Sequence, residues 1–251
     1  MKKILSDYLN TYTAFPADVY LSKSDRKLRH QALKTWADTT FEQMPTCEEV
    51  VAFMKNHEHI DYKKPFFEKI LFPQIESDLQ HGNVTGIKFL IDYPTVKHYT
   101  NNASQKLFDA FLNKHYPKYE KIDLIDLLLA VEPDHENALF EKYYLSQSWL
   151  KFSIHAMPAG ILSGKNIDGT GSMVPLYNWL DVLIKLSEKF GEDHQSLIKI
   201  CSVLFPAWEV YLTCLESYQG FEDYLIKNNF DDLGGGLYGS CNYNYGGISD
   251  D

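Results

Sequence analysis

Hydrophobic side chains recur along much of this chain at the spacing of an amphipathic helix. The clearest case lies in the last quarter, where apolar positions follow one another in alternating steps of four and three residues. Such steps keep every member on one stripe of a helix. The stripe comprises Leu197, Cys201, Leu204, Trp208, Tyr211 and Leu215. We predict a central helix over residues 193–217, kinked at Pro206 because proline lacks a backbone donor.

Start and stop signals predict further helices. Thr46 and Glu49 form a capping box in front of a helix over residues 47–56. Another helix begins at Pro65, is kinked or split at Pro73 and ends at Gly82. Others are expected over residues 104–115, 119–131, 134–156, 174–190 and 221–228. Because short connections favour antiparallel neighbours, we predict an all-α fold of antiparallel helical hairpins, either a bundle or a short α-solenoid.

Glycine-rich segments suggest how the chain is divided. Residues 158–173 hold four glycines and predict a connecting loop between an N-terminal helical part, 1–157, and a C-terminal helical part, 174–230, that packs on the first. Residues 231–251 contain six of the 14 glycines and end in two aspartates. They predict an irregular, acidic, Gly-rich C-terminal tail.

The segment from Ala130 to Leu139 reads as a helix that stops at Pro133, followed by a helix with the small residue Ala138 near its start. This stretch resembles the junction between two tetratricopeptide repeats. The resemblance implies a helical hairpin turn at this point. It covers only these residues, because no second copy stands at the repeat spacing of about 34 residues, and Lys121 and His155 stand where the family has alanines.

Composition narrows the classes of function. The 251 residues carry a formal net charge of −10, and only Arg26 and Arg29 of the 24 basic residues are arginines. Proteins that bind phosphates favour the bidentate fork of arginine, so nucleic-acid binding is disfavoured. Four cysteines at spacings unlike a disulfide framework or zinc site fit a reduced, cytoplasmic protein. No apolar run reaches the length of a signal or membrane-spanning segment, so no membrane partner is expected.

Motifs that suggest chemistry have simpler interpretations. Residues 160–166 look like a phosphate loop, but three residues rather than four separate the glycines, and Asn166 lacks the hydroxyl that binds magnesium. His57 and His59 stand two apart and point away from each other on a helix. His155 falls near a helix end, where charge compensation is the commoner role of histidine. We therefore expect no catalytic residue, no metal and no cofactor.

Charge is distributed unevenly between the ends. Residues 207–251 hold eight acids and one base, which predicts a surface that contacts a basic protein partner. Its expected binding residues are Glu216, Glu222, Asp223, Asp231 and Asp232. A basic cluster stands on an early helix as a solvated face, as a contact for the chain's own acidic end, or as a site for an anionic partner. The cluster is Lys23, Arg26, Lys27, Arg29 and Lys34.

Two functional hypotheses follow from these patterns. The first is a non-enzymatic helical protein–protein interaction protein: an adaptor, or an inhibitor of a basic partner in the manner of an immunity protein or antitoxin. The alternative is an all-α enzyme or small-ligand binder with a pocket between helices, since such sites assemble from distant residues and leave no local motif. The sequence leaves the oligomeric state open.

Overall fold

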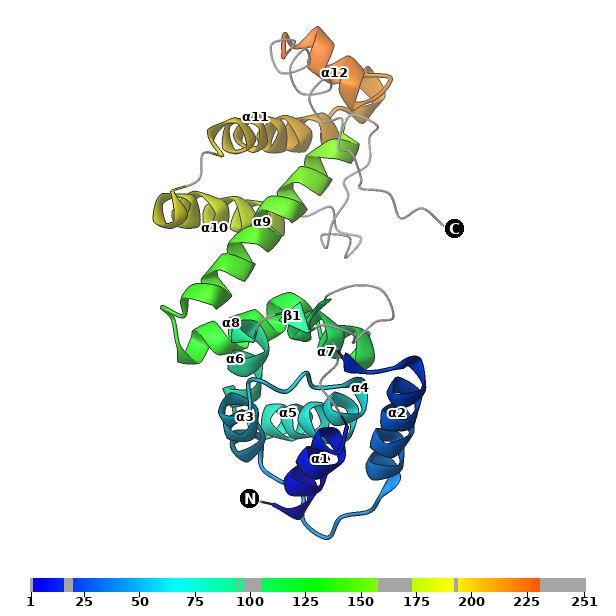
Figure 1. The fold of residues 1–251 in the computed structure, drawn as a ribbon. Coiled ribbons are helices and arrows are strands. Elements are labelled where there is room, and N and C mark those ends of the chain that lie inside the picture. The colour runs from blue at the N-terminus through cyan, green and yellow to red at the C-terminus, as the bar shows by residue number, and fades with distance from the viewer. Residues whose placement is uncertain are drawn as a thin grey trace. The chain divides into compact units, whose positions relative to one another are not determined.

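Helices provide nearly all regular structure in the computed structural model, which describes residues 2–15, 20–93, 95–96, 105–157, 173–191 and 194–230 (Figure 1). The predicted all-α fold is confirmed. Within those ranges the strands are β1 (Thr95–Val96) and β2 (Gln105–Lys106), an antiparallel pair. The chain forms two compact units, unit 1 (Met1–Ala138) and unit 2 (Leu139–Asp251). The predicted tail, 231–251, lies outside the described residues.

Unit 1 contains short helices that follow one another closely along the chain. They are α1 (Lys3–Thr13), α2 (Lys23–Asp38), α3 (Cys47–Asn56), α4 (Lys64–Phe66), a π-helix (Phe67–Leu71), α5 (Phe72–Gln80), α6 (Thr85–Asp92), α7 (Leu107–His115) and α8 (Lys121–Val131). α1 packs against α2, and α6 packs against α3, α5, α7 and α8. The short α6 is therefore the central helix of unit 1.

The capping box predicted for α3 is present. The Thr46 hydroxyl accepts a hydrogen bond from the Glu49 amide at 3.2 Å, and the Glu49 carboxylate accepts one from the Thr46 amide at 2.9 Å. Two of the amides that a helix start leaves unpaired are thus satisfied. The helix covers Cys47–Asn56, as the sequence predicts.

The split predicted at Pro73 is also present, in an unexpected form. A π-helix turn ends at Leu71, and Pro73 lies in the first turn of α5. Proline has no amide to donate, and its ring clashes with the carbonyl four residues earlier, so the helix widens just before it. α5 ends at Gln80, and Gly82 adopts the left-handed φ of 72° that favours glycine at a helix end.

An aromatic cluster forms the N-terminal half of the unit 1 core. The Tyr8 ring is fully buried, with its centroid 4.6 Å from that of Phe66 and 4.9 Å from that of Trp36. Its hydroxyl accepts a hydrogen bond from the Lys63 amide at 3.2 Å, and the Trp36 indole donates to the Ile4 carbonyl. Burial of these polar atoms is therefore compensated by hydrogen bonds. The cluster ties α1 and α2 to the segment around α4.

The junction between α8 and the next helix, α9 (Glu136–Ala156), is a tight turn around Pro133. The His135 ring accepts a hydrogen bond from the Ala138 amide through Nδ1, and its Nε2 lies 3.4 Å from the Asp92 carboxylate. Lys88 of α6 forms an ion pair with Glu132 at 2.6 Å. A turn thus separates the two helices at this point, whereas the resemblance to a junction between tetratricopeptide repeats stays a prediction.

Unit 2 contains α9, α10 (Val174–Phe190), α11 (Gln195–Leu212), a 3₁₀ helix (Leu215–Ser217) and α12 (Phe221–Lys227). α10 has the predicted bounds. Leu150 and Ile154 of α9 share one buried cluster with residues of α10, α11 and α12. The boundary between the two units lies at Ala138 and Leu139, which places most of α9 in unit 2. Of the predicted connection 158–173 the structure describes only Met173.

The predicted stripe of α11 is buried as far as Tyr211. Leu215 is the exception, with 49 % of its surface exposed, because α11 ends at Leu212 and the chain leaves the helical path before Leu215. The sequence predicts helix up to residue 217. Pro206 is accommodated inside α11 without ending it.

Candidate functional site

The predicted acidic surface lies on the last two described elements of unit 2. Glu216 belongs to the 3₁₀ helix and Glu222 to the first turn of α12. Both side chains are exposed, and within the described part of the chain neither has a hydrogen bond or ion pair. Asp231 and Asp232, which complete the predicted surface, lie outside the described residues. Two unneutralised carboxylates are thus available to a partner on this surface.

Asp223 has a different role from its two neighbours. Its carboxylate accepts a hydrogen bond from the Lys227 ammonium at 2.8 Å and another from the Gln219 amide at 3.0 Å. These two bonds, with the one from Lys227 the stronger, hold the pKa of the Asp223 carboxyl below its ordinary value. Asp223 therefore stabilises the start of α12, and its charge is largely compensated by Lys227.

Two large apolar side chains stand beside the free carboxylates. Leu215, 49 % exposed, precedes Glu216 in the chain, and Ile226, 56 % exposed, follows Glu222 by four residues on the same face of α12. In a contact with a partner, such aliphatic side chains would supply apolar burial and the unpaired acids would select for basic groups. We call Leu215, Glu216, Glu222 and Ile226 the α12 surface.

The basic cluster on α2 is confirmed for all of its members except Arg29. Lys23, Arg26, Lys27 and Lys34 are exposed, but Arg29 is buried, with only 6 % of its surface exposed. The Arg29 guanidinium lies over the Tyr12 ring, 5.2 Å from its centroid. That contact offsets part of the cost of burying a charge. Arg29 is therefore a packing residue between α1 and α2, and the sequence does not distinguish it from its exposed neighbours.

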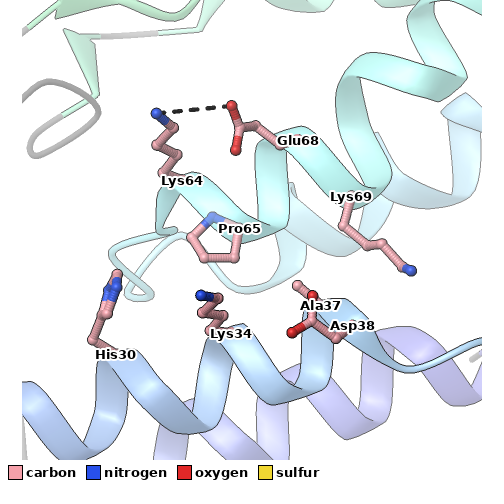
Figure 2. Close-up of a pocket in the computed structure, with 8 residues that line it drawn as sticks. All are labelled: His30, Lys34, Ala37, Asp38, Lys64, Pro65, Glu68 and Lys69. Carbon is pink, nitrogen blue, oxygen red and sulfur yellow. Dashed lines mark ion pairs between the residues drawn. The ribbon is translucent and has the colours of Figure 1, made fainter.

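A groove runs between α2 and the segment that begins at α4, with a volume of about 530 Å³ (Figure 2). Its lining comes from two stretches some 30 residues apart in the chain. They are His30, Lys34, Ala37 and Asp38 of α2, and Lys64, Pro65, Glu68 and Lys69 of α4 and the π-helix. The groove is open to solvent, and its lining carries three lysines against two carboxylates.

Two of the three cysteines that the structure describes are not poised for chemistry, and the third, Cys214, is half-buried. Cys47 and Cys201 are buried, and desolvation raises the pKa of the Cys201 thiol to about 12. Burial likewise raises the pKa of Cys47, which contacts Asp78. A thiol with a raised pKa is a poor nucleophile at neutral pH because the thiolate is the reactive form. Cys241 lies outside the described residues.

Histidines in the described ranges do not assemble into a metal site. The His57 and His59 ring centroids are 6.1 Å apart, and His57 Nδ1 lies 2.9 Å from the Phe53 carbonyl oxygen. Among the described residues no group of three His, Cys, Asp or Glu side chains can hold a metal ion. His155 is exposed on α9, and His194 lies within hydrogen-bond distance of Gln147 at 2.9 Å.

One histidine that the sequence does not single out is surrounded by aromatic rings. His115 Nδ1 lies 3.4 Å from the Glu76 carboxylate, and its ring centroid lies 4.5 Å from that of Phe111. Its Nε2 is buried without a hydrogen-bond partner, and desolvation, the largest influence, lowers the pKa of His115. Nε2 therefore does not reach solvent, whereas 26 % of the Glu76 side chain is exposed.

Comparison with family models, with curated proteins and with solved structures finds no match to this chain. In the stretches of chain that the structure describes, the helices are all too short or too polar to cross a bilayer.

The two candidate sites differ in how visible they are in the sequence. Glu216 and Glu222 lie in one short segment of the chain, so its excess of acidic residues is enough to predict them as site residues. Lys64 and Lys69 reach the α2 groove only because α4 packs on α2, so no local pattern predicts that they join Lys34.

Proposed function

We propose that this chain is a non-enzymatic helical protein–protein interaction protein that binds a basic partner through the C-terminal end of unit 2. The observation that supports the proposal is the α12 surface, in which free carboxylates stand next to exposed leucine and isoleucine. A basic protein with a small apolar patch is complementary to it in charge and in hydrophobicity. Asp231 and Asp232 add negative charge in the residues that follow, whereas the charge of Asp223 is largely compensated by Lys227.

Two biological roles fit such a surface. An adaptor holds its partner next to a second protein, whereas an inhibitor in the manner of an immunity protein or antitoxin covers the functional surface of a basic enzyme. Electrostatic attraction would accelerate association in both cases and weaken with salt. The two roles differ in outcome, because only an inhibitor abolishes an activity of the partner at one-to-one stoichiometry.

The test starts with affinity purification from the native host, using the full chain and a version that ends at Phe230. Phe230 is retained because its ring packs against Tyr224, at 6.2 Å between centroids, so that removal of the tail leaves α12 intact. The partner identified by mass spectrometry is then purified, and its affinity for the full chain is measured by isothermal titration calorimetry.

A charge-matched pair of variants locates the surface. Glu216→Gln with Glu222→Gln removes the two free carboxylates, and we expect the dissociation constant to rise roughly five- to thirtyfold. Asp181→Asn with Glu188→Gln makes the same change of charge on exposed positions of α10 and should leave the affinity within about twofold. Equal affinities for the two double variants, or a captured partner that is acidic, would refute the proposal.

The alternative, an all-α enzyme or small-ligand binder, would draw support from a closed pocket with a histidine beside a buried carboxylate. The α2 groove contains His30, but it is open, and its carboxylates, on Asp38 and Glu68, are exposed and half-buried respectively. The groove is therefore better suited to an extended segment of another protein than to an enclosed small molecule.

A further inference from the structure

The exposed face of α2 carries a continuous row of basic side chains. Lys23, Lys27, His30 and Lys34 follow one another in steps of four, three and four residues, so they lie on one stripe of the helix. All four are exposed, and none has an ion pair within the residues that the structure describes. The stripe leads into the groove, which His30 and Lys34 line (Figure 2).

The opposite wall of the groove adds further positive charge. Lys69 extends from the π-helix and, like Lys34, has no ion pair in the described part of the chain (Figure 2). Glu68 is neutralised, because Lys114 lies 3.3 Å and Lys64 3.9 Å from its carboxylate. Asp38 is the lining carboxylate that has no such compensation among the described residues.

Apolar groups lie between the charged ones. Pro65, in the first turn of α4, projects toward α2, and Ala37 lies on the α2 side of the groove (Figure 2). An open groove with Pro65 and Ala37 between lysines on both sides offers apolar contact and positive charge to an extended chain that carries carboxylates. Lysine ammonium groups meet single carboxylates well as compact point charges.

We propose that the α2 groove binds an acidic peptide segment of a second protein. Two features favour a peptide over a nucleic acid. The basic residues of the stripe and of the groove are lysines and His30, with no arginine among them, whereas phosphate recognition relies on the arginine fork. The groove lining also contains no Phe, Tyr or Trp side chain, and the His30 ring is the one surface on it where a base could stack. The inference is independent of the α12 surface, which has the opposite charge and a different partner.

The experiment measures fluorescence anisotropy of a short fluorescein-labelled peptide that alternates glutamate with leucine and glycine, titrated with the full chain. We expect saturable binding that weakens as salt rises from about 0.05 M to about 0.3 M, because screening shortens the range of the attraction. A peptide with glutamine in place of every glutamate serves as the neutral probe and should bind at least about tenfold more weakly.

Variants then place the site. Lys34→Gln with Lys69→Gln removes one ammonium from each wall and should weaken binding of the acidic peptide roughly five- to thirtyfold. Lys185→Gln with Lys199→Gln removes the same charge from exposed positions of unit 2 and should change it less than about twofold. Asp38→Asn removes the uncompensated carboxylate and should strengthen binding about two- to threefold.

Three results would overturn the inference. One is no saturable binding of the acidic peptide by the full chain at low salt. Another is an equal loss of affinity in the groove double variant and the unit 2 double variant, which would mean attraction by overall charge alone. The third is displacement of the peptide by a single-stranded oligonucleotide or by inorganic phosphate. If sodium chloride of equal ionic strength does not displace the peptide, this result would mean that the groove binds phosphate groups.

Discussion

Replacement of Gly86 by alanine tests how unit 1 is held together. Gly86 is buried in α6, the helix against which α3, α5, α7 and α8 pack. A β-carbon at this position would lie 2.7 Å from Cγ1 of Ile75 and 3.1 Å from Sγ of Cys47. Ordinary carbon–carbon contacts are about 3.5–4.0 Å, so Ile75 and the backbone near it would have to move by close to an ångström.

The expected cost follows from two opposing contributions. Extra methyl groups in a packed core cost about 1–3 kcal/mol, whereas alanine is better than glycine in a helix by about 1 kcal/mol. The net cost is then about 0–2 kcal/mol, and we expect Gly86→Ala to lower the free energy of unfolding of unit 1 by about 1–2 kcal/mol, because a contact at 2.7 Å to a branched side chain needs a large shift. In an Ile75→Ala background the atom at 2.7 Å is gone, and the contacts at 3.1 Å with Sγ of Cys47 and at 3.2 Å with Cβ of residue 75 need only small shifts, so the same replacement should there be within about 1 kcal/mol of neutral.

The assay is urea unfolding followed by far-ultraviolet circular dichroism, with hydrogen exchange and mass spectrometry to assign the change to unit 1. Gly220→Ala is the control, because its β-carbon would meet nothing within 4 Å and its φ of 169° is ordinary extended backbone. The reasoning is refuted if Gly86→Ala is as stable as the unmodified chain, or if its cost persists in the Ile75→Ala background.

Of three further predictions, two concern the loss of a single hydrogen bond and one concerns the titration of a carboxyl group. Thr46→Ala should lower the free energy of unfolding by about 1 kcal/mol, measured by urea unfolding, because the capping hydroxyl of α3 is lost. Tyr8→Phe should cost about 1–2 kcal/mol in the same assay, because the Lys63 amide loses its acceptor inside the core. Burial raises the pKa of the Asp78 carboxyl, one oxygen of which has no hydrogen-bond partner, so the folded state binds the proton more tightly than the unfolded state. The protonated Asp78 carboxyl therefore contributes fully to the stability of the folded state below its ordinary pKa, and this contribution is lost as pH rises through the raised pKa. Asp78→Asn should flatten the pH dependence of the melting temperature in that pH window.

Each of these predictions has a matched control. Thr40→Ala removes an exposed threonine outside the helices and should be neutral, and Tyr20→Phe does the same for an exposed tyrosine. Asp181→Asn replaces an exposed aspartate and should leave the pH profile of the melting temperature unchanged. A Thr46 or Tyr8 variant as stable as its control, or an Asp78 variant whose profile follows that of the unmodified chain, would contradict the corresponding prediction.

The sequence by itself determined the helices and several of their ends. The capping box at Thr46 and Glu49 and the stop at Gly82 act through neighbouring backbone groups, so they are visible in a few consecutive residues. The all-α class follows from the same local signals repeated along the chain. The acidic character of the C-terminal end is likewise a property of consecutive residues. Glu216 and Glu222 are exposed there, and their role in binding a partner stays a prediction.

Only the tertiary structure decided which charges are available and where surfaces form. Arg29 and Lys34 have the same sequence signal, yet Arg29 is buried over Tyr12 while Lys34 lines a groove. Leu215 follows the spacing of a core stripe but is exposed because α11 ends first. The groove itself joins residues some 30 positions apart. Burial and long-range packing depend on how helices meet, and the spacing of residues within one helix carries no information about that.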